Sequence, residues 1–263
     1  MATQHSDNPV DLDVNYRYLE SYVIERAEGE SFSVLDFGCG EGELVRVLRQ
    51  KGINCYGAEV FYPGGTYNSR NTAELVERGI IRTFPENTPL PFDDSSFDLV
   101  ISNQVFEHVD RLEPIVSELA RVLKEDGTAY HHFPSREVLR EGHIGIPLAH
   151  RLPKGGLRFA YVALLRRLGL GSNKRDLSIR GWTRVMLAWL DEYCYYRPYG
   201  QIVSEFKKYF WIEHREIDYC RFRAAARPWL RRILEIESLR GFYERLFRRL
   251  AFMALEMRKR PTR

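Results

Sequence analysis

A glycine-rich turn after Asp36 is the part of this sequence whose residue types and spacing most directly predict chemistry. It reads Asp-Phe-Gly-Cys-Gly-Glu-Gly over residues 36–42 and begins inside an apolar run that reads as a buried strand. Because glycine has no Cβ, backbone N–H groups in such a turn can approach a ligand where a side chain would obstruct it. The turn therefore predicts a ligand site at the end of a buried strand.

The spacing of the glycines and the acid before them narrow the kind of ligand. Dinucleotide-binding turns follow the pattern G-x-G-x-x-G, whereas Gly38, Gly40 and Gly42 are evenly spaced. The Asp36 carboxylate would repel a diphosphate, but it suits a ligand with an ammonium and a sulfonium, through a direct or water-mediated contact. S-Adenosylmethionine carries both groups and is the cofactor we expect.

The segment VLDFGCGEGELV resembles motif I of the class I S-adenosylmethionine-dependent methyltransferases, of the methyltransferase type 11-like kind. The order of later segments matches that family from about residue 14 to residue 134, which is about half of the chain. Glu59 lies 21 residues beyond Gly38, where a carboxylate can accept both ribose hydroxyl protons.

The resemblance implies further cofactor contacts after the third and fourth strands. Glu86 matches the acceptor for the adenine amine and Asn87 a backbone contact, although the family more often has Asp-Ala there; the phrase LPFDDSSFDLV that follows is typical of these enzymes. Asn103 and Gln104 match the segment that faces the methionine part. The predicted cofactor-binding residues are Asp36, Gly38, Cys39, Gly40, Gly42, Glu59, Val60, Glu86, Asn87, Asn103 and Gln104.

Histidines are the second chemical signal, because five of the seven lie within residues 108–150. Methyl transfer is an in-line displacement at a carbon already activated by the sulfonium, so positioning supplies much of the catalysis. A hydroxyl acceptor benefits from a base that titrates near neutrality, which is the range of imidazole. His143 is the preferred candidate for this base, and His108 and His132 are the others.

Structural roles remain open for the same side chains. The histidines can equally cap turns in an ordered loop, and His108 can hold a helix start. A metal site built from His143, His150 and Glu141 ranks low because the spacing matches no helix-face pair, and we expect no metal. Tyr16 and Tyr18 are expected to be packing groups.

The elements that must position these residues alternate along the first half of the chain. The sequence predicts strands at residues 33–37, 53–60, 79–84, 97–102 and 128–133, and helices at 14–27, 43–52, 71–78 and 112–123. This alternation predicts an α/β fold: a Rossmann-like doubly wound sheet, mostly parallel with an antiparallel edge strand, plus a helical insertion and a C-terminal helix.

The predicted organisation has four parts. They are a cofactor-binding core at residues 1–134, a helical acceptor-binding insertion at 135–205, one or more returning sheet strands at 206–226, and a basic amphipathic C-terminal helix at 227–263. Residues 221–263 hold 13 Lys and Arg against 4 Asp and Glu, whereas the whole chain has a net charge of +3. The interval 227–260 is therefore expected to pack on the body or to touch an anionic membrane surface.

Composition excludes several classes of protein. No apolar stretch is long enough to span a bilayer and the start lacks a secretory signal pattern, so we expect a cytoplasmic protein, with possible peripheral contact at the inner membrane face. The four cysteines fit neither a zinc pattern nor a disulfide framework. Without a zinc-binding, helix-turn-helix or RNA-reading motif, nucleic acid is an unlikely partner.

These observations predict a methyltransferase that acts on an oxygen of a small molecule or glycan. The phrase EGHIGIP, with His150-Arg151-Leu152-Pro153 after it, resembles methyltransferases that act on glycans or glycolipids. The alternatives are an RNA or protein methyltransferase, or a non-catalytic cofactor-binding or scaffold protein with the same fold.

Overall fold

A seven-stranded sheet forms the centre of the protein. The computed structural model describes residues 12–29, 31–61, 70–174 and 176–261. The strand order is β3-β2-β1-β4-β5-β7-β6, and β7 is antiparallel to both of its neighbours whereas the pairings among β1 to β5 are parallel. The strands are β1 (Ser33–Phe37), β2 (Asn54–Glu59), β3 (Ile81–Thr83), β4 (Phe97–Asn103), β5 (Leu123–Phe133), β6 (Phe210–His214) and β7 (Met253–Lys259).

Helices cover both faces of this sheet, and each face has its own apolar cluster. On one face lie α1 (Val14–Ile24), α2 (Glu43–Gln50) and α3 (Arg70–Glu77), with the side chain of Val34 turned towards them. On the other lie α4 (Leu112–Val122) and α7 (Tyr199–Phe206), which share a cluster with Leu35. Successive residues of β1 thus point to opposite faces, as strand geometry requires. The predicted doubly wound α/β fold is confirmed.

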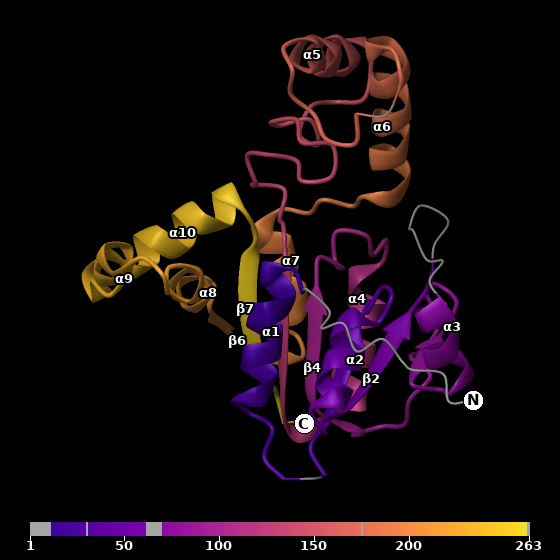
Figure 1. The fold of residues 1–263 in the computed structure, drawn as a ribbon, viewed down its shortest axis with the longest axis vertical. Helices are drawn as coiled ribbons and strands as arrows, with labels where there is room; N and C mark the ends of the chain where they lie inside the picture. Colours follow the sequence, from indigo (N-terminus) through magenta and orange to yellow (C-terminus); the bar gives the residue numbers. More distant parts are fainter. Residues whose placement is uncertain (1–11, 30, 62–69, 175, 262–263) are drawn as a thin grey trace, which may run out of the picture.

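The segment after β5 forms a helical lobe beyond the carboxyl ends of the parallel strands (Figure 1). It contains α5 (Gly156–Arg167) and α6 (Ile179–Tyr193), which pack around the fully buried Trp182 in a separate apolar cluster. The predicted insertion reached residue 205, but α7 lies at the sheet and packs against α4 rather than joining the lobe.

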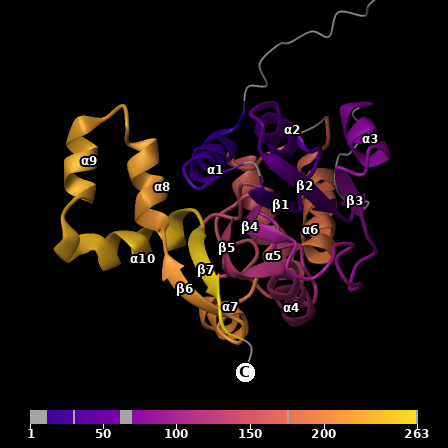
Figure 2. The ribbon, with the colours of Figure 1, turned by 90° about the horizontal axis from the view of Figure 1, so that it is seen from below.

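The C-terminal quarter differs from the prediction of a returning strand followed by a single helix. The strand β6 ends at His214, and Glu216–Arg223 forms α8, with acids in its first turn and arginines in its last, which favours a helix through its dipole. The region predicted as a helix over 227–260 contains α9 (Pro228–Leu234), a 3₁₀ turn (Glu237–Leu239), α10 (Arg240–Leu250) and then β7. Together α8, α9 and α10 project beyond the β6 edge of the sheet (Figure 2).

The strand β7 replaces the predicted end of that helix because the sheet offers it two partners. It pairs with β5 on one side and β6 on the other, and its residues from Met253 to Met257 are buried. Backbone pairing on both edges, together with burial on both faces, outweighs the helical spacing of the apolar residues that precede it.

Substitution of two leucines, one on each side of the boundary between α10 and β7, tests whether residues 253–259 form a buried strand. Leu255 is fully buried in β7, whereas Leu250 at the end of α10 is 56% exposed. We expect Leu255→Ala to lower the free energy of unfolding in urea by about 2–5 kcal/mol, through lost burial and the cavity left behind. The matched Leu250→Ala should change it by less than about 0.5 kcal/mol. Equal losses in the two variants would contradict the strand assignment.

Candidate functional site

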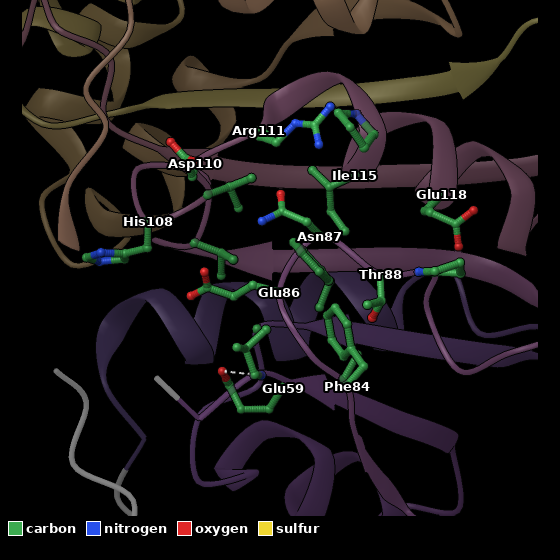
Figure 3. Close-up of a pocket in the computed structure, with 18 of the residues that line it drawn as sticks. Glu59, Phe84, Glu86, Asn87, Thr88, His108, Asp110, Arg111, Ile115 and Glu118 are labelled. Atoms are coloured by element: carbon green, nitrogen blue, oxygen red, sulfur yellow. Dashed lines mark hydrogen bonds between the residues drawn. The ribbon is translucent and has the colours of Figure 1, made fainter. Parts of the chain in front are cut away.

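A cavity of about 550 Å³ opens at the carboxyl ends of β1, β2 and β4, beside the start of α4 (Figure 3). Nine of the predicted site residues line it: Gly38, Gly40, Glu59, Val60, Glu86, Asn87, Asn103, Gln104 and His108. The predicted residues that do not line it are Asp36, Cys39, Gly42, His132 and His143. The sequence thus located the cavity, and the structure separates the residues on its wall from those behind it.

The Glu59 carboxylate connects the end of β2 to the glycine loop after β1. Its Oε2 accepts a hydrogen bond from the Gly40 N–H at 2.7 Å, and its Oε1 accepts from the N–H groups of Val60 at 2.9 Å and Phe61 at 3.3 Å. Burial raises the pKa of Glu59, against the effect of these three hydrogen bonds. Each carboxylate oxygen has two lone pairs, so acceptor capacity remains for a ligand in the cavity.

Two glycines of the loop serve different needs. Gly38 and Gly40 have φ values of +71° and +54°, which side chains rarely tolerate. A Cβ on Gly38 would collide with the side chain of Val105, so this glycine permits close packing. A Cβ on Gly40 would meet no described heavy atom within 4 Å, and because Gly40 lines the cavity, the space there is open to a ligand.

Cys39 and Gly42, both predicted as cofactor contacts, lie behind the loop rather than on the cavity wall. The Cys39 side chain is buried against Gly57. Gly42 caps the start of α2, and a Cβ on it would lie 2.6 Å from Cδ1 of Ile81 in β3. Any contact from these two residues to a ligand would be through the backbone, because the side chain of Cys39 and the Cβ direction of Gly42 point into packed residues.

Asp36 lies behind the cavity with an incompletely satisfied carboxylate. It is 1% exposed, and its Oδ2 has no hydrogen-bond partner in the described part of the chain. Burial, with the charge of Glu59 adding to it, raises the pKa of Asp36 to about 7. A buried acid of this kind gains from a cationic group nearby.

Tyr16 on α1 packs against the apolar cluster that contains Val34, as the sequence predicted, and it also lines the cavity. Burial, and next the charge of Asp36, raise its pKa. Tyr18 is buried among aromatic rings, as expected. Helical spacing alone did not distinguish the two tyrosines, because both belong to the same amphipathic helix.

Strained backbone marks two residues of the cavity wall. Asn87 and Gln104 have φ values of +60° and +56°, which are uncommon for residues with a side chain. The Gln104 N–H donates to the His132 carbonyl at 2.8 Å, and its buried Nε2 has no hydrogen-bond partner among the described residues. Such outliers persist where the surroundings over-determine them, and they often occur at functional sites.

His132, one of the three candidate bases, is wrongly placed for that role. Its ring is fully buried and packs edge-on against Phe252 and Tyr219, with ring centroids 4.9 Å and 5.9 Å away. Burial lowers its pKa to about 3. Its strand has helices on both faces, so neither side of β5 at this position opens to the cavity.

His108 and His143 lie together, and only His108 reaches the cavity. The two Nε2 atoms are 3.2 Å apart, and the His143 Nδ1 is 2.7 Å from a carboxylate oxygen of Glu141. Burial, together with His143, lowers the pKa of His108 to about 4, whereas Glu141 outweighs burial and raises that of His143. His150 does not join this group, because its Nε2 pairs with the Arg136 carbonyl. The structure therefore does not bring His143, His150 and Glu141 together as the metal site that was considered, and ranked low, from the sequence.

Comparison with known proteins gives a family for the part of the chain that carries the cavity. Residues 35–131 match the family described as methyltransferase domain. We refer to residues 35–131 below as the methyltransferase domain, after the family that they resemble. It contains most of the cavity wall, including Gly40 and Glu59, whereas Tyr16 and the helical lobe lie outside the match.

Individual relatives share this domain rather than the whole chain. A probable tocopherol O-methyltransferase from Oryza sativa subsp. japonica is 38% identical over 105 residues, covering 38% of this chain and 28% of the relative. A norajmaline N-methyltransferase from Rauvolfia serpentina is 33% identical over 96 residues, covering 34% and 32%. The chain thus spans about a third of the length of these curated relatives.

A solved structure extends the likeness in fold beyond the methyltransferase domain. The S-adenosylmethionine-dependent methyltransferase from Mesorhizobium loti is 15% identical, with a TM-score of 0.52 over 95% of this chain and 99% of that one. At this identity the likeness concerns the fold alone.

The raised pKa of Asp36 makes the stability of the methyltransferase domain depend on pH. The carboxyl ionises at its ordinary pKa of 3.8 in the unfolded chain but near pH 7 in the folded protein, so folding favours its protonated form. The resulting stabilisation is complete below pH 3.8 and is lost as the pH rises through about 7. Asp36→Asn cannot ionise at this position. Between pH 3.8 and about 7, the free energy of unfolding of the ligand-free wild type should therefore fall by at most about 4 kcal/mol relative to that of Asp36→Asn.

Urea unfolding at a series of pH values measures this difference. Asp93→Asn, which removes an exposed carboxylate in a turn, is the control and should track the wild type. If the difference in free energy of unfolding between wild type and Asp36→Asn does not vary with pH, the pKa of Asp36 is not raised.

Proposed function

We propose that this protein is a class I methyltransferase that uses S-adenosylmethionine. The observation that carries the proposal is the Glu59 carboxylate on the cavity wall, hydrogen-bonded to the Gly40 N–H of the glycine loop. When bound, the cofactor supplies a methyl group activated by its sulfonium. Glu59 would hold the ribose hydroxyls, and the open space at Gly40 admits the cofactor next to the backbone.

The charges around the cavity support a cationic ligand. The buried Asp36 carboxylate lacks a partner for one oxygen within the described residues, and the acids Glu59, Glu86 and Asp110 line the wall. A ligand with an ammonium would supply the missing countercharge, whereas a diphosphate would be repelled. Tyr16, Asn103 and Gln104 are the residues that would bind the methionine part.

We propose further that the methyl acceptor is a hydroxyl group of a small molecule or glycan. The helical lobe lies beyond the carboxyl ends of the parallel strands and, through His108, meets the cavity, so it is positioned to bind a substrate that enters there (Figure 1). The O-methyltransferase among the relatives supports transfer to oxygen, although another relative is named as an N-methyltransferase. That His143 or His108 serves as the base stays a prediction.

Titration calorimetry with S-adenosylmethionine tests the proposal. We expect the wild type to bind, and Glu59→Ala to bind at least about tenfold more weakly, because a charged hydrogen-bond partner contributes about 1.5–3 kcal/mol. Glu77→Gln, which changes an exposed carboxylate on α3, is the control. A wild type that does not bind the cofactor would overturn the proposal.

Release of S-adenosylhomocysteine then tests the acceptor class. A panel of free and lipid-linked saccharides is expected to yield product, and transfer RNA and peptide substrates serve as the alternative acceptors. A chain that binds the cofactor but releases no product with any of them would be a binding protein with this fold.

We also propose that the arginine-rich hairpin, defined as α9, the 3₁₀ turn and α10, contacts anionic lipid. Neither helix contains a buried residue. Its exposed apolar side chains are Trp229, Ile233, Ile236, Leu239, Phe242, Leu246 and Leu250. Residues 227–250 carry 7 arginines against 3 glutamates, a charge that favours an anionic surface over a second copy of the same hairpin. None of the described helices combines the length and apolarity needed to cross a bilayer.

Co-sedimentation with vesicles tests this contact. We expect binding to vesicles that contain phosphatidylserine, loss of binding as salt increases, and at least about tenfold weaker binding in Phe242→Ala, because a buried phenylalanine contributes about 1.5–3 kcal/mol. Leu157→Ala, which removes a 78% exposed side chain on the distant helix α5, is the control. Equal binding to neutral phosphatidylcholine vesicles would contradict the proposal.

A further inference from the structure

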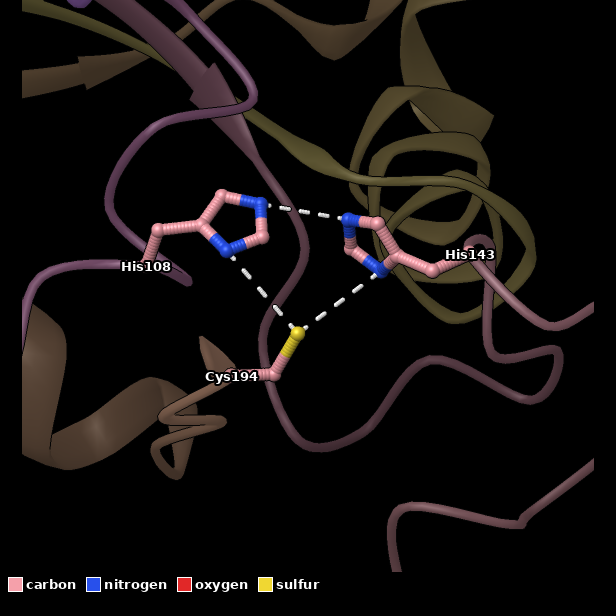
Figure 4. A group of neighbouring side chains, drawn as sticks. All are labelled: His108, His143 and Cys194. Carbon is pink, nitrogen blue, oxygen red and sulfur yellow. Dashed lines mark hydrogen bonds between the residues drawn. The ribbon is translucent and has the colours of Figure 1, made fainter. Parts of the chain in front are cut away.

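Three segments that are distant in sequence meet beside the cavity. His108 follows β4, His143 follows β5, and Cys194 follows α6, and one potential ligand atom from each lies within 4.8 Å of the other two (Figure 4). The sequence predicted no metal site, because no short-range spacing connects these positions.

Hydrogen bonds at the far side of each ring fix which nitrogens can act as ligands. The His108 Nδ1 lies 2.7 Å from the Tyr193 carbonyl, which only accepts, so this nitrogen carries the proton. The His143 Nδ1 donates in the same way to the Glu141 carboxylate at 2.7 Å. When a ring carries only this one proton, its Nε2 presents a lone pair, and carboxylate or carbonyl partners of this kind are typical of metal-binding histidines.

The two Nε2 atoms face each other at a distance that suits a shared cation. They are 3.2 Å apart, and two nitrogen ligands about 2.0–2.1 Å from a tetrahedral ion would be separated by roughly 3.3 Å. Without a shared proton or cation, two lone pairs at this distance repel each other. The Cys194 sulfur lies 3.9 Å and 4.0 Å from the Nδ1 atoms of the two rings, so a zinc ion held by the Nε2 atoms requires this side chain to turn towards it (Figure 4).

A buried acid next to this group also lacks a partner. Glu107 is 1% exposed, and neither of its carboxylate oxygens has a hydrogen-bond partner within the described ranges. It is close enough to interact electrostatically with His143 and Cys194. An unpaired buried carboxylate is costly, and a divalent cation nearby would supply its countercharge.

We propose that His108, His143 and Cys194 bind one zinc ion. Two imidazole nitrogens and a thiolate select zinc over the harder ions magnesium and calcium. Binding displaces the thiol proton to solvent and leaves the sulfur as a thiolate ligand. The ion fastens both ends of the helical lobe, through His143 and Cys194, to the methyltransferase domain at His108. His108 also lines the cavity, and a zinc ion on the Nε2 atoms would exclude His108 and His143 as the base.

Metal content of the tag-free protein tests the proposal. After incubation with zinc sulfate and removal of excess metal, we expect mass spectrometry of the digested protein to find one zinc ion per chain. Cys194→Ser and His143→Ala should lower zinc affinity by more than about 100-fold, which exceeds the effect of losing an outer-shell partner. Cys220→Ser and His150→Ala remove a cysteine and a histidine outside the group, and both should keep the wild-type zinc content.

Cobalt substitution gives a readout that a merely structural role would not change. We expect the cobalt-loaded wild type to show sulfur-to-cobalt charge-transfer absorption, which Cys194→Ser abolishes and Cys220→Ser retains. A wild type that holds no zinc overturns the proposal even if the variants do not fold. Zinc retained equally by Cys194→Ser and His143→Ala overturns it as well. Neither result bears on the binding of S-adenosylmethionine.

Discussion

The hydrogen bond from the Gly40 N–H to the Glu59 carboxylate is the interaction on which the site depends. It connects two neighbouring parallel strands near their carboxyl ends, next to the backbone hydrogen bond from the Gly38 N–H to the Ala58 carbonyl. The glycine loop must adopt left-handed backbone conformations to turn there, and Glu59 holds it in place with a charged acceptor. The same carboxylate faces the cavity, so the group that shapes the loop also presents charge to a ligand.

The first half of the fold was predictable because its signals are local. Buried strands, the glycine turn and the acid at the end of β2 are each contained within a few residues, and parallel strands bring their carboxyl ends to one edge. Most of the predicted cofactor residues therefore line the cavity. Cys39 and Gly42 do not, because the turn alternates between the cavity and the core over single residues, which a motif cannot resolve.

The acceptor side was less predictable because long-range packing determines it. The sequence places His131 and His132 on opposite faces of a strand, but it does not show that helices cover both faces. The sequence predicted His143 as a base, but its neighbours His108 and Cys194 come from segments that only the folded chain brings together. The charges of α8 could have predicted a helix, because Glu216 and Asp218 lie in its first turn and Arg221 and Arg223 in its last. The alternation of apolar residues led to the prediction of a strand instead.

The position of β7 has a consequence for how the chain acquires its structure. Thr128 pairs with Arg258, and β6 pairs only with β7 among the described strands, so one side of the sheet is held together by contacts between residues far apart in sequence. During synthesis, β1 to β4 can associate early, whereas β5 keeps an unpaired edge until residues 253–259 emerge from the ribosome. Pairings of such high contact order form slowly and leave strand edges open to other chains in the interval. Assembly of this half of the protein is therefore a late event, and the nascent chain is most exposed to aggregation just before it.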